Sequence, residues 1–166
     1  MGRILCCSFL PIADGKRNRP YTFRLDDKQY KADDPIDDRK ICVAIRDELE
    51  KYHMVIGWNS KLFDHSFLDA RLAQVGERPF NKHLVLDMMW YAGQNSLRIG
   101  SRKLDNVAKF FKLKSQKTPI DWDDWKRAAL GDKEAMDKVV VHCEADVKTL
   151  AEAYWAMLPM VKTIHR

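Results

Sequence analysis

The sequence contains no hydrophobic run that approaches the roughly 20 residues needed to cross a bilayer. One basic residue precedes a short apolar run at its start, and the polar segment 14–19 that follows is not a signal-peptide cleavage pattern. None of the four cysteines is spaced as a zinc-binding pair or a redox motif. Repeats, low-complexity tracts and long linkers are missing as well. We therefore expect a cytoplasmic protein with reduced thiols, no contact with a membrane, and a single domain over residues 1–166.

Basic residues outnumber acidic ones, and the formal net charge is +5. Much of the excess lies in one part of the sequence and comprises Arg98, Arg102, Lys103, Lys109, Lys112, Lys114 and Lys117. A clustered basic surface suits a polyanion such as nucleic acid. The solvated helix faces of any basic protein have the same composition, so charge alone leaves both interpretations open.

The first half of the sequence predicts a hairpin followed by a helix. Residues 4–12 form a largely apolar run, and residues 21–25 alternate apolar with polar, which together predict an antiparallel strand pair. The acidic segment 33–38 is a candidate metal site, but Asp34 before Pro35 is typical of a helix N-terminus. We favour a helix that begins there and ends near residues 52–53.

The second half predicts another strand and three helices. Residues 83–87 form a strand that leads into a helix, with Asp87 as a helix cap or a supporting residue of the site. Ser101 is a candidate cap for a helix over 102–113, and 120–130 predicts a short helix whose tryptophans, Trp122 and Trp125, pack in the core or a groove.

Two segments bring together side chains suited to chemistry. Residues 54–56 predict a buried strand, followed by a polar break at Asn59 and by a helix, so Asp64 lies just past the strand's carboxyl end. That edge of an open α/β sheet is where ligands bind.

The last helix, predicted over 132–158, carries the second segment. Its predicted buried stripe consists of Val140, Cys143, Val147, Leu150 and Tyr154. His142 and Asp146 are one turn apart on the neighbouring face with Thr149, where one site can use both side chains.

These two segments carry a family resemblance. Asn59, a gap of three residues, then Phe63-Asp64 resembles the second motif of DEDD-type 3′→5′ exonucleases, and His142 before Asp146 is similar to their third motif. The pattern looks most like the proofreading domains of family B DNA polymerases and their stand-alone relatives. The resemblance implies an α/β, RNase H-like mixed sheet flanked by helices. One departure concerns His142: its spacing is that of the tyrosine subtype, whereas the histidine subtype places its His one residue earlier, where this sequence has Val141.

The resemblance also implies a metal-dependent site. Two divalent cations, Mg²⁺ or Mn²⁺, would bind carboxylates and activate a water, with Asp64 and Asp146 as metal ligands. The implied catalytic residues are Asp64, His142 and Asp146. The implied substrate-binding residues are Asn59, Phe63, Arg102 and Lys103. The implied partners are the 3′ end of single-stranded DNA, a polymerase or another replication protein, and a second copy of the chain.

One motif of the family is not found in the sequence. The family's first motif, Asp-x-Glu, belongs on a central strand before Gly2, and no such motif precedes the predicted hairpin. We therefore expect a sheet without its first, central strand, weak metal binding and little hydrolysis. Three explanations stay open: a truncated exonuclease, a catalytically inactive nuclease-fold protein that binds nucleic acid or a protein partner, and an α/β interaction domain whose motifs are coincidental.

Overall fold

The computed structural model describes residues 2–12, 19–34, 36–81, 84–93, 97–115 and 118–161. The strands are β1 (Cys6–Phe9), β2 (Tyr21–Arg24), β3 (Met54–Gly57) and β4 (Leu84–Asp87). The helices are α1 (Arg39–Leu49), α2 (Asp64–Gln74), α3 (Met88–Ala92), α4 (Leu104–Phe110), α5 (Trp122–Ala129), α6 (Lys133–Met157) and the 3₁₀ turn η1 (Leu158–Met160). The order of strands and helices follows the sequence prediction, and the fold class is mixed α/β.

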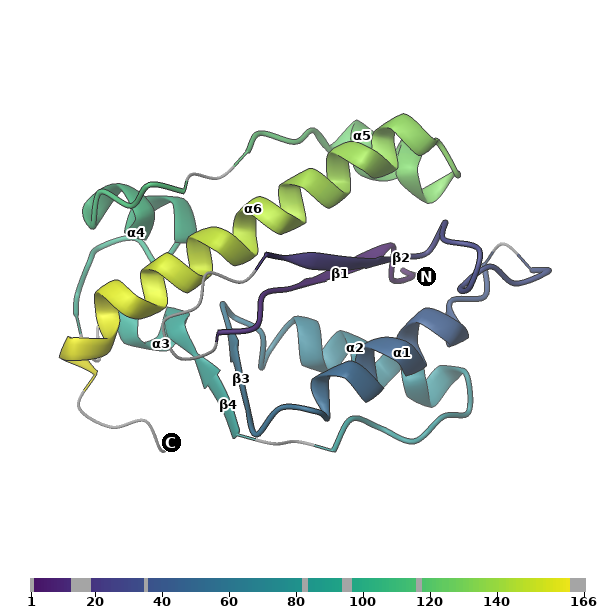
Figure 1. Ribbon diagram of the computed structural model, residues 1–166, viewed down its shortest axis with the longest axis horizontal. Helices are drawn as coiled ribbons and strands as arrows, with labels where there is room; N and C mark the ends of the chain where they lie inside the picture. Colours follow the sequence, from purple (N-terminus) through teal and green to yellow (C-terminus); the bar gives the residue numbers. More distant parts are fainter. Residues whose placement is uncertain are drawn as a thin grey trace.

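The strands form two separate pairs. β1 and β2 are antiparallel with Cys6 opposite Arg24, and β3 and β4 are parallel with Gly57 opposite Asp87. Within the described ranges no ladder of backbone hydrogen bonds joins one pair to the other. The predicted hairpin and the predicted strands at 54–56 and 83–87 are therefore confirmed in their described parts, as two small sheets (Figure 1).

The longest helix, α6, connects the two sheets. Figure 1 shows the β1–β2 hairpin between α5 and α6 on one side and α1 and α2 on the other. The first half of α6 packs with α5 and with Leu5 and Cys6, while its second half packs with side chains of β3 and β4. A third apolar cluster fills the space between the hairpin, α1 and α2. Because α6 contributes to two of the three clusters, it determines how the sheets lie relative to each other.

The buried face of α6 differs from the predicted stripe. Apart from Tyr154, the residues predicted to be buried are half-buried, whereas His142 and Thr149 are almost completely buried. The reason is that α6 is covered on more than one side, by β1 and β2 and also by α4 and α5. The face with His142 and Asp146 therefore lies partly beneath neighbouring elements, not beside the core as predicted.

The predicted start of the first helix is also wrong. α1 begins at Arg39, and the Asp34 carboxylate accepts a local hydrogen bond from the backbone N–H of Ile36, while Pro35 lies outside the described residues. Asp38, predicted in the first turn, is fully buried and accepts hydrogen bonds from Arg71 and from the backbone N–H of Ile4. This tertiary pairing replaces the expected cap.

Two smaller predictions also need correction. α4 begins at Leu104, not next to Ser101, whose hydroxyl accepts only a long bond of 3.4 Å from the backbone of Lys103. Trp122 is 73% exposed and is therefore not a core residue. It lies on the outer side of α5, which faces solvent. Trp125 packs edge-on against His142 and lines an open pocket, which agrees with the predicted packing in the core or a groove.

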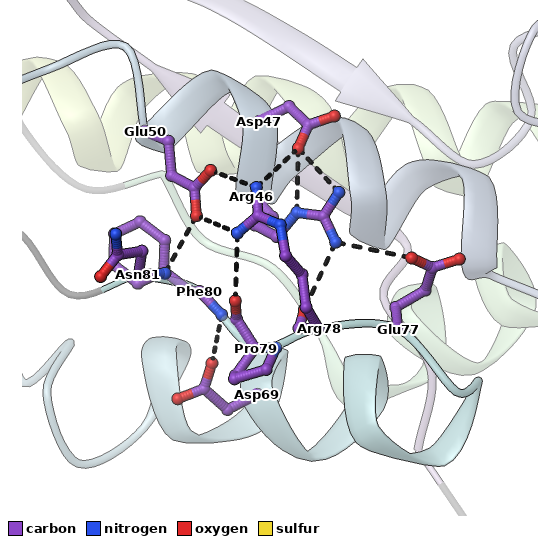
Figure 2. Close-up of polar contacts among 9 residues, drawn as sticks. All are labelled: Arg46, Asp47, Glu50, Asp69, Glu77, Arg78, Pro79, Phe80 and Asn81. Carbon is purple, nitrogen blue, oxygen red and sulfur yellow. Dashed lines mark hydrogen bonds and ion pairs between the residues drawn. The ribbon is translucent and has the colours of Figure 1, made fainter.

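A network of charged side chains fastens the segment between α2 and β4 to α1 (Figure 2). Arg78 donates two hydrogen bonds to Glu50, and the same carboxylate accepts a bond from the backbone of Asn81. Arg46 forms ion pairs with Asp47 and Glu77. The network holds the approach to β4 in place on the side of the molecule away from α6.

Glu50 gives this network a pH dependence. Its hydrogen bonds with Arg78 lower the pKa of Glu50 from 4.5 to about 2. A carboxyl whose pKa is lower in the folded protein stabilises the fold above its ordinary pKa and loses that contribution as the pH falls toward 2. We expect Glu50→Gln to have a lower free energy of unfolding than the wild type above pH 5, because the variant lacks the ionised carboxylate. This difference should shrink on acidification. Urea titrations at several pH values measure this. Glu134→Gln, an exposed change on α6, is the control, and an equal difference at every pH would contradict the assignment.

Candidate active site

Asp87 organises the carboxyl ends of the parallel strands. Its Oδ1 accepts hydrogen bonds from the backbone N–H groups of Asn59, at 2.8 Å, and Met89, at 3.2 Å. Its Oδ2 accepts a weaker hydrogen bond of 3.3 Å from the backbone N–H of Lys61. Asp87 is thus the cap of α3, as predicted, and also fixes the loop that leads from β3 to α2.

The loop held by Asp87 presents aromatic and acidic groups to solvent. Asn59 has a φ of 60°, a left-handed conformation that asparagine tolerates better than most residues, and it turns the chain sharply after β3. Leu62 and Phe63 are 80% and 66% exposed. Asp64 is the first residue of α2. The loop therefore places an exposed aromatic ring directly before a carboxylate.

Asp64 is exposed to solvent, but other atoms of the protein crowd its carboxyl group and desolvate it in part. This partial burial raises its pKa, the charge of Asp87 adds to the rise, and its own backbone N–H opposes it. The Cys7 thiol on β1 lies within electrostatic reach of both Asp64 and Cys143 of α6.

His142 is held in one orientation. Its ring is 6% exposed, packs edge-on against Trp125, and has Nδ1 2.8 Å from the carbonyl oxygen of Thr118. A carbonyl oxygen can only accept a hydrogen bond, so Nδ1 carries the ring proton and donates a hydrogen bond to the carbonyl oxygen of Thr118. In the neutral ring, Nε2 is then the basic nitrogen with a free lone pair.

The basic nitrogen of His142 faces Asp146. Nε2 lies 3.6 Å from Asp146 Oδ2, and the other carboxylate oxygen of Asp146 is buried. Beside the pair, an open pocket of about 570 Å³ is lined by Asp105, Thr118, Pro119, Ile120, Trp125 and His142. A water molecule between Nε2 and the carboxylate would be within reach of a base and of a second acceptor.

The predicted basic residues lie at the strand ends. The indole nitrogen of Trp58, the residue after β3, donates a 3.0 Å hydrogen bond to the backbone carbonyl of Arg102. Arg102 and Lys103 are both exposed, and Lys103 immediately precedes α4. The indole hydrogen bond therefore anchors the backbone that carries these two cationic side chains to the Trp58 ring.

The structure brings the predicted site residues together in two groups. One group is at the β3 end, where Asn59, Phe63 and Asp64 follow the strand and the Trp58 indole holds the backbone of the segment that carries Arg102 and Lys103. The other is the His142–Asp146 pair on α6. Across the residues that the structure describes, no three His, Cys, Asp or Glu side chains are grouped as metal ligands. The acidic residues present therefore do not fit the predicted two-cation site.

Two residues that line the pocket beside His142 were not identified from the sequence. Thr118 orients His142 through its backbone carbonyl, and a backbone carbonyl leaves no signal in residue type. Asp105 lines the same pocket but was absorbed in a helix prediction, where an acidic residue in the first turn is ordinary.

Comparison with known proteins gives one match. A family model described as the RNase_H superfamily matches residues 14–157. No curated protein and no solved structure matches the chain. Among the described residues, none of the helices is both long enough and apolar enough to cross a membrane.

Proposed function

Because this chain belongs to the RNase H superfamily, we propose that it is a 3′→5′ exonuclease-type domain that acts on the 3′ ends of single-stranded DNA. The superfamily gives it a nuclease-like fold, and folds of this kind generally bind nucleic acid. The proposal adds the reaction, its polarity and the substrate. It rests mainly on one observation, the orientation of His142 toward Asp146.

In the proposed reaction His142 is the general base. Thr118 holds the proton on Nδ1, so Nε2 can take a proton from water as the water attacks the phosphorus atom. The bond from phosphorus to the 3′ oxygen of the preceding nucleotide breaks, and that oxygen leaves and takes up a proton from solvent. Asp146, 3.6 Å away, stabilises the imidazolium that forms. The buried ring loses no freedom when substrate binds, because Trp125 and Thr118 already hold it.

The β3 group is the proposed seat of the strand end. Phe63 is exposed and can stack on a base, a contact worth about 1–3 kcal/mol in proteins that bind single strands. Arg102 and Lys103 can neutralise phosphates. The hydrogen bond from the Trp58 indole to the carbonyl oxygen of Arg102 holds the backbone of these two residues near the end of β3. Asp64, directly after Phe63, is the carboxylate nearest to the proposed terminal nucleotide.

Nucleases with an RNase H-like fold typically use divalent metals. Asp64 and Asp146 are the acidic residues that would hold Mg²⁺ or Mn²⁺, but because they do not complete a two-cation site among the described residues, no step of the proposed reaction is assigned to a metal. The described residues do not assemble a third ligand beside either carboxylate. We therefore expect weak metal binding and slow hydrolysis.

The missing third ligand among the described residues also favours a second candidate, a nuclease-fold protein that binds nucleic acid or a protein partner without cleaving it. A polymerase-associated role and pairing with a second copy belong to this candidate as well. The two functions share the binding surface and differ in turnover. A binding experiment and a cleavage experiment are therefore both needed.

The binding surface is tested by removing its two cations. We expect Arg102→Ala with Lys103→Ala to weaken the binding of single-stranded DNA roughly tenfold at low salt. The slope of log affinity against log salt should fall by about 1.4, since each lost phosphate contact removes about 0.7. Fluorescence anisotropy of a labelled oligonucleotide measures both quantities.

A matched pair on α6 controls for net charge. Lys133→Ala with Lys138→Ala removes the same charge from a region where both lysines pair with acidic residues. If this control weakens binding as much as the Arg102 and Lys103 changes, the β3 end is not the binding surface. Equal affinity of the wild type for RNA would leave the surface in place and change the substrate.

A further inference from the structure

Two cysteines far apart in the sequence meet between β1 and α6. The Sγ atoms of Cys6 and Cys143 are 3.7 Å apart, and the Cys6 thiol donates a hydrogen bond to the other sulfur. Both side chains are half-buried in the apolar cluster that joins β1, α5 and the first half of α6. Since a disulfide has a sulfur separation of about 2.05 Å, the two atoms need to approach by less than about 2 Å.

The neighbouring cysteines face elsewhere. Cys7 follows Cys6 on the strand, so its side chain points to the opposite face, toward the cluster formed with α1 and α2. Cys42 is fully buried in that same cluster. The hydrogen bond of Cys6 is with Cys143, on the other face of the strand.

We propose that Cys6 and Cys143 are a modification site, a dithiol that a small-molecule disulfide oxidises to an intramolecular disulfide between β1 and α6. One thiolate attacks the small disulfide, which forms a mixed disulfide and releases one thiol. The second cysteine then displaces the second thiol and completes the bond. Two cysteine thiols are oxidised and one disulfide is reduced, with two protons retained on the released thiols. This inference does not depend on the proposed nuclease function.

The location gives such a bond a structural effect. No backbone ladder among the described residues joins the two sheets, and α6 is the element that packs against both. A covalent link from β1 to α6 therefore constrains the contact that holds the hairpin to the rest of the molecule. It also adjoins His142, the residue before Cys143.

The reaction should be slow in the reduced protein. The hydrogen bond with Cys143 is the largest cause of a raised pKa for Cys6, and burial raises it further. The attacking thiolate is therefore scarce at neutral pH. Oxidation over hours with excess oxidised glutathione is the appropriate condition.

The experiment uses the full chain and the adjacent cysteine as control. After oxidation, intact mass should fall by two hydrogen atoms with two thiols protected from alkylation, and the Tm should rise by about 5 °C or more. Cys7→Ala should retain both effects, whereas Cys6→Ala and Cys143→Ala should lose them. The reduced variants are first compared with reduced wild type by thermal unfolding, so that only folded variants are scored. Persistence of the bond in Cys6→Ala, its loss in folded Cys7→Ala, or formation only of glutathione adducts or dimers would overturn the proposal.

Discussion

Replacement of Arg71 by Met should destabilise the protein by about 3–5 kcal/mol, because it leaves a buried carboxylate without its cation. Asp38 is fully buried, and Arg71 is only 7% exposed. The guanidinium donates two hydrogen bonds to Asp38, at 2.5 and 3.0 Å, and another to Gln74. In the variant, the backbone N–H of Ile4, at 2.8 Å, is the main hydrogen-bond donor that Asp38 retains.

The position of this ion pair explains the size of the effect. Asp38 precedes α1, Arg71 lies on α2, and Ile4 leads into β1, so one carboxylate joins three elements. Chemical denaturation measures the free energy of unfolding, and the Tm should fall by about 10 °C or more. Arg78→Met is the matched control, since its ion pair with Glu50 is more exposed and its loss should lower the Tm by much less than the loss of the buried pair. An equally small change in Arg71→Met would show that the buried pair does not hold these elements together.

Asp146→Asn should lower the rate of phosphodiester cleavage at least about a hundredfold, the usual scale of a lost general-base arrangement. The amide keeps the shape of the side chain but removes the charge that faces Nε2 of His142. His142→Gln should lower the rate to a similar extent, because it removes the proposed base. The two changes together should cost little more than either alone, since the residues act as a unit.

Controls separate this effect from misfolding and from weakened binding. Glu134→Gln makes the same kind of change at an exposed position on the same helix and should leave the rate unchanged. Asp146→Asn should bind single-stranded DNA with affinity within a few-fold of the wild type. Cleavage that continues at the wild-type rate in folded Asp146→Asn would remove the α6 pair from the proposed mechanism.

Local sequence patterns predicted the parts of the fold that local physics determines. The apolar run before Gly57 forms β3, and the polar break at Asn59 is the turn that precedes α2, because strand and helix periodicities differ over short windows. The last helix was predicted over 132–158, and α6 begins at Lys133, where the structure adds that the Asp132 carboxylate caps it by accepting a hydrogen bond from the N–H of Ala135.

Tertiary pairing decided the features that sequence could not predict. Asp38 was assigned to a helix terminus because nothing local indicates that Arg71, 33 residues away, binds it. The burial of His142 depends on α5 and Thr118, which cover a second side of α6. The separation of the strands into two pairs likewise depends on hydrogen bonds that no side-chain pattern specifies.

The members of the site remain predictions, and local sequence patterns did not indicate how those residues are arranged. Asp64 and Asp146 were identified from their places after a strand and on a helix face. Their failure to gather a third ligand among the described residues is a three-dimensional property. Cys6 and Cys143 were interpreted as unremarkable buried thiols, because only the structure brings them to 3.7 Å.

The most direct test of the proposed function is the polarity of cleavage. Single-stranded DNA labelled at its 3′ or its 5′ end is incubated with excess wild-type protein and Mn²⁺ or Mg²⁺, and the products are separated by electrophoresis. We expect slow release of labelled mononucleotide from the 3′-labelled strand and a ladder of shortened products from the 5′-labelled strand. Internal cuts, shortening from the 5′ end, or DNA that is bound but left intact over the full course would contradict a 3′→5′ exonuclease.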